Sequence, residues 1–458
     1  MTRVAIVGGG PGGYEAALVA SRLGADVTLI ERDGPGGSAV LTDCVPSKTL
    51  IATSDLLTGG RSASELGVDV TTDPRVNLQA VNERVLGLAR AQSDDIAERL
   101  EMSGVEIIAG TGRLDGTGGV VASVDGEERH VPADGVLLAT GAHPRVVDSA
   151  VPDGERIFTW EQIYALREVP EHMVVVGSGV TGAEFASAYN GLGCRVTLVS
   201  SRDRVLPGED PDAATLIEDV FTRRGMDVLD RSRMAAVERV RDGVRVTLTD
   251  GRAVEGSHCL LALGSIPSTA DLGLQAAGVA VDDRGFITVD RVSRTTAPGI
   301  YAAGDCTGVF MLASVAAQQG RIAMAHLLGD AVNPLDLSKV CSNIFTSPEI
   351  ATVGPSQGTL DEAGLHVDVA MLPLATNPRA KMQGLHDGFV KLYSRKSTGT
   401  VLGGVIVSPR ASELIHTVSL AVSMQLTVDQ VADAFTVYPS LSGSVAEAAR
   451  RLHRQVAL

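Results

Sequence analysis

The chain has 458 residues, a length that is enough for about three folded domains and excludes a small stapled scaffold. Of these residues 44% are apolar and 21% are charged, a composition that excludes a fibrous repeat and wholesale disorder. A formal net charge of −16 at pH 7 disfavours nucleic acid as a partner, because a phosphate backbone repels it. No apolar run approaches the roughly 18 residues that span a bilayer. The first apolar segment also meets glycines too early for a secretory signal, so we expect a cytoplasmic protein. The five cysteines are scattered and lack metal-ligand spacing, so neither a disulfide framework nor a metal site is expected.

The first predicted element is a short apolar strand over 4–7, followed by a glycine-rich turn and a helix of small residues. The turn matches GxGxxG in the strand, turn and helix context that this motif needs. Such glycines allow the sharp turn, the approach of a pyrophosphate and close packing of helix on strand. A second strand over 26–30 ends in Glu31, placed to accept ribose hydroxyls, and Arg32 follows it. The segment predicts a dinucleotide site with contacts from Gly8, Gly10, Gly12 and Gly13.

The same pattern recurs in the middle of the chain. An apolar strand over 173–176 precedes a glycine-rich turn and a second helix of small residues. Because strand, turn and helix again occur together, the glycines are expected to bind a second dinucleotide rather than to form an ordinary turn. The contacts expected there come from Gly177, Gly179 and Gly182.

The nucleotide preference of the second site depends on the residues after its next strand, over 195–199. Where the first site has an acid, this one has Ser200, followed by Ser201 and Arg202. An acid would repel a 2′-phosphate, whereas hydroxyls beside arginine can bind it. We therefore expect NADPH to be preferred over NADH. The alternative is that Arg202 and Arg204 are solvated loop charges.

Three further apolar segments, 136–141, 259–264 and 299–305, each end at a glycine turn. Asp305 ends the last of them, where a carboxylate can accept a hydrogen bond from a ribityl or ribose hydroxyl. A simple helix N-cap is the alternative role of Asp305.

The chain changes character at about residue 336, after which no glycine fingerprint appears. Residues 388–393 and 401–407 are predicted strands of a sheet, and helices are predicted after Ala411 and Val428. The sequence therefore predicts an α/β protein with two Rossmann-like nucleotide-binding domains and a C-terminal α+β domain.

In order and nearly end to end, the chain resembles the flavoprotein disulfide reductases, the family of lipoamide dehydrogenase and glutathione reductase. The resemblance implies FAD at the first fingerprint, NAD(P)H at the second, and dimerisation through the last domain. It divides the chain into an FAD-binding domain over 1–147 and 267–335, an NAD(P)H-binding domain over 148–266 and a dimerisation domain over 336–458. It is carried by Gly8–Gly13 with Glu31, Gly36-Gly37 through Pro46-Ser47-Lys48, Thr140-Gly141, Gly177–Glu184, Gly304-Asp305 and Phe345–Gly354.

The resemblance also implies which residues surround the flavin. Lys48 and Glu184 are expected to pair near flavin N5, where a cation stabilises the negative charge of reduced flavin and the carboxylate holds that cation in place. Further cofactor contacts are expected from Gly37, Ser38, Gly112, Thr140, Gly141, Gly264, Gly304, Asp305 and Ala313.

Departures from the family pattern determine the function that we expect. The redox motif of the family is GGxCxxxxCxxSK, but here Ala39 occupies the outer cysteine position and only Cys44 remains. A single thiol cannot form the internal disulfide that dithiol exchange needs. Near the C-terminus, Tyr438 and Gly443 replace the histidine and glutamate of an HPxxSE-like motif, which removes the acid/base pair for thiols. Cys44 either tunes the flavin or is an inert buried thiol.

We therefore expect an FAD-dependent NAD(P)H oxidoreductase that reduces a small acceptor directly, with a quinone as the best candidate, similar to the quinone-reductase and diaphorase branch of the family. A soluble transhydrogenase and a decayed flavin-binding sensor or scaffold are the alternatives. The resemblance implies a homodimer in which Tyr438 reaches the partner's flavin site, either beside the acceptor or only as a packing residue. Pro439 is expected to follow a cis peptide bond.

Overall fold

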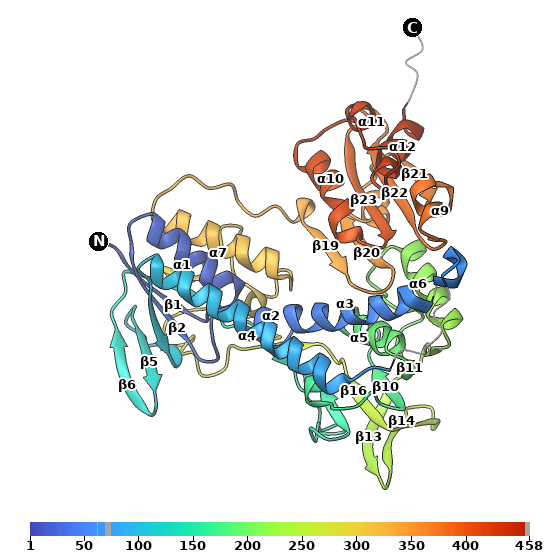
Figure 1. Cartoon of the computed structure of the whole chain (residues 1–458). Coiled ribbons are helices and arrows are strands. Elements are labelled where there is room, and N and C mark those ends of the chain that lie inside the picture. The colour runs from blue at the N-terminus through green and yellow to red at the C-terminus, as the bar shows by residue number, and fades with distance from the viewer. Residues whose placement is uncertain (62, 69–74, 454–458) are drawn as a thin grey trace. The chain divides into compact units, whose positions relative to one another are not determined.

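The computed structural model describes residues 1–61, 63–68 and 75–453, which form two compact units (Figure 1). The first unit contains the described residues of Met1–Thr49, Ala80–Arg145 and Leu263–Asp336. The second unit contains those of Leu50–Gln79, Val146–Ala262 and Leu337–Leu458. The finer domain boundaries given above, at 147/148, 266/267 and 335/336, remain predictions.

The first unit is built on a five-stranded parallel sheet in the order β18-β7-β1-β2-β3. Its central strand is covered on both faces, so the chain there is apolar throughout rather than alternating. In register, Val7 at the end of this strand lies between Ile30 and Leu138. The strands are β1 (Arg3–Val7), β2 (Asp26–Glu31), β3 (Glu106–Ala109), β7 (Gly135–Leu138) and β18 (Ile300–Ala302).

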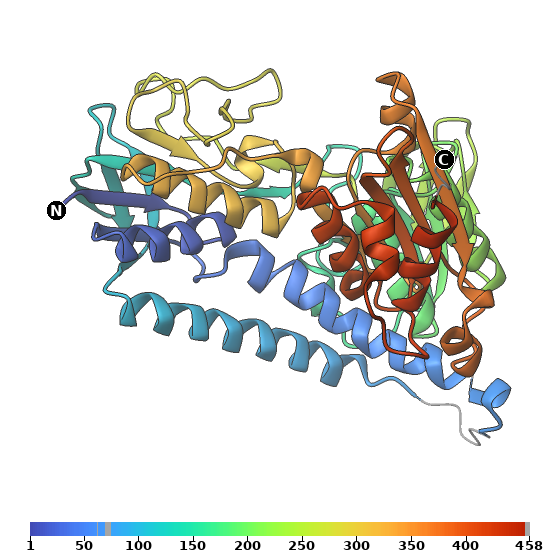
Figure 2. The same ribbon diagram turned by 90° about the horizontal axis from the view of Figure 1, so that it is seen from above.

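Helices α1 (Pro11–Arg22) and α7 (Ala313–Leu327) lie side by side on this sheet in both views (Figures 1 and 2). They touch through backbone, because a Cβ on Gly320 would lie 2.0 Å from the carbonyl oxygen of Gly12. The same unit holds an antiparallel sheet of β4, β5 and β6 and a ribbon of β8 and β17. These strands are β4 (Thr111–Leu114), β5 (Val120–Val124), β6 (Glu127–Val131), β8 (Ala142–Pro144) and β17 (Ser265–Pro267).

The second unit repeats the parallel arrangement in a sheet of order β12-β11-β10-β16-β9, flanked by helices α5 and α6. A three-stranded antiparallel sheet, β13-β14-β15, is attached to it. The elements are β9 (Ile157–Thr159), β10 (His172–Val176), α5 (Val180–Gly191), β11 (Arg195–Val199), α6 (Pro211–Arg223), β12 (Asp227–Leu229), β13 (Met234–Val240), β14 (Gly243–Leu248), β15 (Ala253–Gly256) and β16 (His258–Leu261).

The C-terminal part of the second unit is an antiparallel sheet of order β19-β20-β23-β22-β21, packed on helices around one apolar core. The expected strands at 388–393 and 401–407 are β22 (Phe389–Arg395) and β23 (Val401–Ser408). The other elements are β19 (Cys341–Ile344), β20 (Glu349–Val353), α8 (Gln357–Glu362), β21 (Val367–Pro373), α9 (Pro378–Met382), α10 (Ala411–Ser423), α11 (Val428–Asp433) and α12 (Gly443–Arg451).

The remaining helices connect these sheets. Within the described residues, no helix combines the length and the apolar character needed to cross a membrane. The α/β class with two Rossmann-like halves and a C-terminal α+β part is confirmed. The connecting helices are α2 (Gly37–Leu41), α3 (Cys44–Arg61), α4 (Leu78–Met102) and the short 3₁₀ helices Ala63–Leu66, Ile163–Ala165, Asp305–Thr307, Leu337–Lys339 and Leu374–Thr376.

Candidate active site

The first fingerprint turn contains two kinds of glycine. Two of them are required by close backbone contacts, and one leaves open space beside the backbone. Gly8 has φ +99°, and a Cβ there would lie 2.3 Å from the carbonyl oxygen of Ala139. A Cβ on Gly13 would lie 1.8 Å from the carbonyl oxygen of Gly8, so α1 could not approach β1 with any larger residue. A Cβ on Gly10 would meet nothing within 4 Å. Gly10 therefore opens onto free space at the start of α1, where a phosphate can reach backbone amides.

The second fingerprint turn has the same steric pattern. Gly177 has φ +112° and faces the carbonyl oxygen of Ala262, 2.2 Å from where its Cβ would be. A Cβ on Gly182 would lie 1.8 Å from the carbonyl oxygen of Gly177, and one on Gly179 would meet nothing within 4 Å. Neither α1 nor α5 has a side-chain N-cap, so the first-turn amides of both helices lack a side-chain acceptor. The chain thus contains two turns of matching geometry, each of which offers free backbone amides to an anion.

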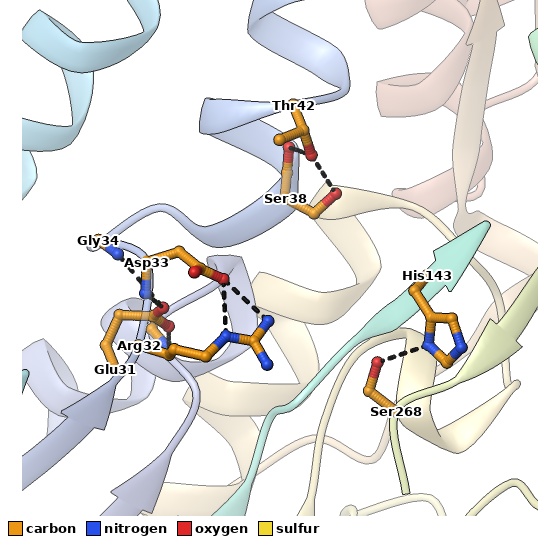
Figure 3. Close-up of polar contacts among 9 residues, drawn as sticks. Glu31, Arg32, Asp33, Gly34, Ser38, Thr42, His143 and Ser268 are labelled. Atoms are coloured by element: carbon orange, nitrogen blue, oxygen red, sulfur yellow. Dashed lines mark hydrogen bonds and ion pairs between the residues drawn. The ribbon is translucent and has the colours of Figure 1, made fainter. Parts of the chain in front are cut away.

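Glu31 joins the end of β2 to the first fingerprint (Figure 3). Its Oε1 accepts hydrogen bonds from the amides of Asp33 at 2.7 Å and Gly34 at 3.3 Å, and its Oε2 accepts one from Gly9. A carboxylate has about four acceptor positions, so capacity for a ribose hydroxyl remains. The exposed Arg32 side chain is paired with Asp33 at 2.9 Å.

The segment at the position of the family's redox motif packs directly on the first fingerprint turn. A Cβ on Gly37, which has φ +55°, would lie 2.8 Å from the Cα of Gly10, and the amide of Gly36 donates to Gly9 at 2.8 Å. The Ser38 hydroxyl in α2 lies 2.9 Å from that of Thr42, the residue after this helix (Figure 3). Ala39 in α2 and Cys44 at the start of α3 are both partly buried.

Thr140 and Asp305 lie just beyond the carboxyl ends of β7 and β18, the edge of a parallel sheet at which nucleotides bind. The Thr140 hydroxyl is buried and has no hydrogen-bond partner among the described residues. Burial, with a smaller effect from Asp43, raises the pKa of the partly buried Asp305 carboxyl to about 6. No residue in the described part of the chain donates a hydrogen bond to that carboxyl. An orphaned hydroxyl and an unpaired acid fit a ligand rich in hydroxyls and carbonyls, as FAD is.

Five further predicted cofactor residues lie in the first unit, four of them at turns or element ends. Gly141 and Gly264 have φ of +69° and +83°, in the left-handed region that favours glycine. Gly112 lies on β4, where a Cβ would be 3.0 Å from a methyl group of Val7. Gly304 has φ +83° and precedes Asp305, and Ala313 opens α7, which has no side-chain N-cap.

The structure places Ser200 inside the turn that follows β11 rather than on its surface. Its side chain is completely buried, and its hydroxyl lies 2.7 Å from that of Ser178 and accepts from the amide of Arg202 at 3.1 Å. Ser201 and Arg202, by contrast, are exposed. The Ser200 hydroxyl, expected at the nucleotide, is instead occupied by these contacts within the protein, and Arg204 is partly exposed beside Ser201 and Arg202.

Glu184 lies on α5 and is only 3% exposed. Its Oε1 accepts a hydrogen bond from the amide of Phe345 at 2.8 Å, and one turn further along α5 the Ser187 hydroxyl accepts one from the amide of Ser347 at 3.1 Å. The helix of the second fingerprint therefore holds the segment after β19. Lys48 lies on α3 and is partly buried, and its pairing with Glu184 remains a prediction.

Tyr438 belongs to an exposed apolar segment between α11 and α12. Phe435 is fully exposed, Val437 is 79% exposed and Tyr438 is 82% exposed. The Tyr438–Pro439 peptide bond is cis, as predicted. Gly443 follows as the first residue of α12.

The family model described as pyridine nucleotide-disulphide oxidoreductase matches residues 2–320. The chain belongs to this family. The model for the dimerisation domain of pyridine nucleotide-disulphide oxidoreductases matches residues 340–449. These matches confirm the resemblance to the flavoprotein disulfide reductases that the motifs indicate.

Several proteins are similar to this pyridine nucleotide-disulphide oxidoreductase over nearly their whole length. The "NAD(P)H dehydrogenase (quinone)" of Mycobacterium tuberculosis is 52% identical over 99% of this chain and 94% of that protein. The crystal structure of LpdA from Mycobacterium tuberculosis has a TM-score of 0.95 and 52% identity, covering 99% of this chain and all of that one. A dihydrolipoyl dehydrogenase of Chlamydia trachomatis is 34% identical over 97% of this chain and 95% of its own. At 24% identity and a TM-score of 0.88, the flavoprotein disulfide reductase RclA from Escherichia coli shares the fold.

Four residues of the second unit make side-chain contacts that the sequence does not predict: Ser178, Asp210, Lys391 and Tyr393. One signal was available, because Lys391 stands among the apolar residues Phe389, Val390 and Leu392 of β22, and a buried ammonium needs carboxylate partners.

Proposed function

We propose that the chain is an FAD-dependent NAD(P)H oxidoreductase that transfers electrons from reduced flavin directly to a quinone. One observation carries the proposal: both nucleotide turns are intact, while Ala39 stands at the outer cysteine position, and Tyr438 and Gly443 stand at the acid/base positions. The name of the 52% identical relative, a quinone-type NAD(P)H dehydrogenase, supports the same acceptor class. The net reaction is NAD(P)H, a proton and a quinone giving NAD(P)⁺ and a hydroquinone.

The residues of the first unit would hold FAD. When bound, FAD supplies a two-electron centre that accepts hydride and returns electrons to an acceptor. The turn at Gly10 and the start of α1 would bind its pyrophosphate, and Glu31 would accept from the adenosine ribose. Thr140 and Asp305 offer the orphaned hydroxyl and the unpaired acid for the ribityl and ring end.

The second fingerprint would hold the nicotinamide nucleotide. The space at Gly179 admits the pyrophosphate, and the exposed Ser201 and Arg202 would bind the 2′-phosphate of NADPH. Lys48 would stabilise charge at the flavin N5 edge, with Glu184 orienting the ammonium.

A homodimer is part of the proposal. The dimerisation-domain match covers 340–449, and the segment from Phe435 to Tyr438 exposes three large apolar or aromatic side chains in the protomer. Tyr438 would border the acceptor site of the partner subunit. Measuring the solution mass by light scattering tests this, and a fully active monomer would contradict it.

The test of the reaction is a steady-state assay of the purified flavoprotein with NADPH or NADH and two parallel acceptors, a small benzoquinone and lipoamide. We expect quinone turnover without disulfide turnover. Ala39→Cys is the matched variant, because it restores the second thiol but not the acid/base pair, so lipoamide turnover should stay negligible. Disulfide turnover by the unmodified chain would overturn the proposal. Reduction of thio-NAD by NADPH, with no quinone turnover, would favour the transhydrogenase instead.

A further inference from the structure

A charged cluster, buried except for the exposed Asp212, lies between β22 and the start of α6 in the second unit. Lys391 is 5% exposed, and its Nζ lies 2.9 Å from Oδ2 of Asp210 and 2.7 Å from Oδ2 of Asp212. The hydroxyl of Tyr393, two residues along the same face of β22, donates to Oδ2 of Asp210 at 2.9 Å. Burying an ion pair costs desolvation free energy that its own attraction often fails to recover, so stability alone does not account for this cluster.

Asp210 connects this cluster to a helix and a loop. Its Oδ1 caps α6 by accepting from the amides of Asp212 at 3.0 Å and Ala213 at 3.3 Å, while its Oδ2 accepts from β22. Burial alone would lower the pKa of Lys391. Its hydrogen bonds and charge interactions with both carboxylates together raise the pKa by more than burial lowers it, so the net shift is upward. The ammonium therefore stays charged, and one carboxylate joins the helix start to the sheet.

Asp210 is also the last residue of the loop 200–210, which we call the nucleotide loop. At the other end of this loop, the buried Ser200 contacts Ser178 of the fingerprint turn. Between the two ends, the amide of Leu206 donates to the carbonyl of Ser178 at 2.9 Å, and that of Val205 donates to Glu218 at 3.1 Å. The loop is thus fixed at both ends and in the middle.

The exposed members of the nucleotide loop include Ser201 and Arg202, the residues proposed to meet the 2′-phosphate. Fixing a loop before binding lowers the conformational entropy that the ligand must remove, which raises affinity. We propose that Lys391 is a positioning residue, which acts through Asp210 to orient the nucleotide loop for the adenosine 2′-phosphate of NADPH. This inference rests on the proposed function.

The test compares Lys391→Met, Tyr393→Phe and Lys391→Arg with the parent holoenzyme. KM and kcat are measured for NADPH and NADH with a benzoquinone, and calorimetry measures the binding of 2′,5′-ADP and 5′-AMP. Thermal unfolding is followed for each variant. Tyr393→Phe is the variant that keeps the buried charges paired, should Lys391→Met fold poorly.

A matched control breaks a different contact between the same two segments. Arg223, at the far end of α6, pairs with Asp387 just before β22 at 2.6 Å, and the Arg223 side chain is exposed. Arg223→Met therefore removes an ion pair between α6 and this part of the sheet without touching the nucleotide loop.

We expect Lys391→Met to raise KM for NADPH and Kd for 2′,5′-ADP about tenfold, with KM for NADH, Kd for 5′-AMP and kcat nearly unchanged. Tyr393→Phe should give a smaller shift in the same direction, Lys391→Arg should restore much of the affinity, and Arg223→Met should change neither nucleotide. Equal losses for both nucleotides, or lower thermal stability with unchanged selectivity, would overturn the positioning role and leave the proposed function standing. If the parent protein binds none of these nucleotides, the proposed function itself fails.

Discussion

The side-chain hydroxyls of Ser178 and Ser200 lie 2.7 Å apart, and the two residues are 5% and 0% exposed. Ser178 belongs to the second fingerprint turn, and Ser200 directly follows β11, so one buried hydrogen bond joins the two segments proposed to hold opposite ends of the nucleotide's adenosine half. These segments should therefore move together when a nucleotide binds.

Replacing Ser200 by alanine should destabilise the protein. The Ser178 hydroxyl and the Arg202 amide would each lose a buried partner, which costs about 1–3 kcal/mol of unfolding free energy. Urea denaturation measures this loss. The exposed neighbour provides the control, because Ser201→Ala should change the unfolding free energy by less than about 0.5 kcal/mol. Equal effects of the two changes would show that the buried hydrogen bond contributes nothing to stability.

Replacing Arg202 by leucine should convert a preference for NADPH into one for NADH. Loss of a charge-assisted contact with the 2′-phosphate should raise KM for NADPH about tenfold or more and leave KM for NADH nearly unchanged. Arg195→Gln is the matched control, because it removes an exposed arginine at the opposite end of β11. It should change neither the KM for NADPH nor the KM for NADH. If Arg202→Leu has no effect, Arg202 is a solvated loop charge.

Gly10→Ala and Gly179→Ala should each impair one of the two proposed nucleotide sites and leave the other unaffected. A Cβ at either position meets no protein atom within 4 Å, so both variants should fold with near-normal stability. Gly10→Ala should lose bound flavin, because the methyl group occupies the approach of the pyrophosphate. Gly179→Ala should keep its flavin and show a raised KM for both nicotinamide nucleotides. Absorbance spectra and steady-state kinetics measure these outcomes.

Gly13→Ala is the contrasting variant for the same experiment. Its Cβ would lie 1.8 Å from the carbonyl oxygen of Gly8, so α1 or β1 must shift. We expect a lower thermal stability together with loss of flavin. Should Gly10→Ala unfold as readily as Gly13→Ala, the distinction between open and packed glycines would be wrong.

Asp305 gives the apoprotein a pH-dependent stability of defined sign. Its pKa is about 6 in the folded chain, raised from 3.8 chiefly by burial. Between these values the folded state binds a proton that the unfolded state has already released, so stability falls as pH rises from about 4 to about 6 and then levels off. Asp305→Asn should remove this contribution. Denaturant unfolding of both apoproteins across this range measures the difference, and parallel curves would contradict the assignment.

Both fingerprint turns could be predicted from sequence, because the residues that form each turn lie close together along the chain. The glycines at 8, 10 and 13, the strand before them and Glu31 after the next strand all lie within one short stretch, and steric exclusion at backbone oxygens fixes which positions must be glycine. The cis bond before Pro439 was anticipated only through the family motif.

The contacts that could not be predicted join residues far apart in sequence. Glu184 accepts from Phe345, 161 positions away, and Lys391 pairs with Asp210, 181 positions away. No periodicity links such residues, because their meeting depends on how whole sheets pack. The inward turn of Ser200 was missed for a related reason, since a serine at the end of a strand reads the same whether its hydroxyl faces a ligand or another serine.

The packing of Gly36 and Gly37 on Gly9 and Gly10 has an evolutionary consequence. The segment in which other family members carry two cysteines is held on the first fingerprint turn here by the backbone packing of Gly37 on Gly10 and by the hydrogen bond from the amide of Gly36 to Gly9. An ancestor could therefore exchange a cysteine for Ala39 without disturbing the neighbouring loop. The backbone conformation of this segment therefore does not depend on the side chains that carry the redox chemistry. New electron acceptors could be acquired by changing single side chains while this backbone stays the same.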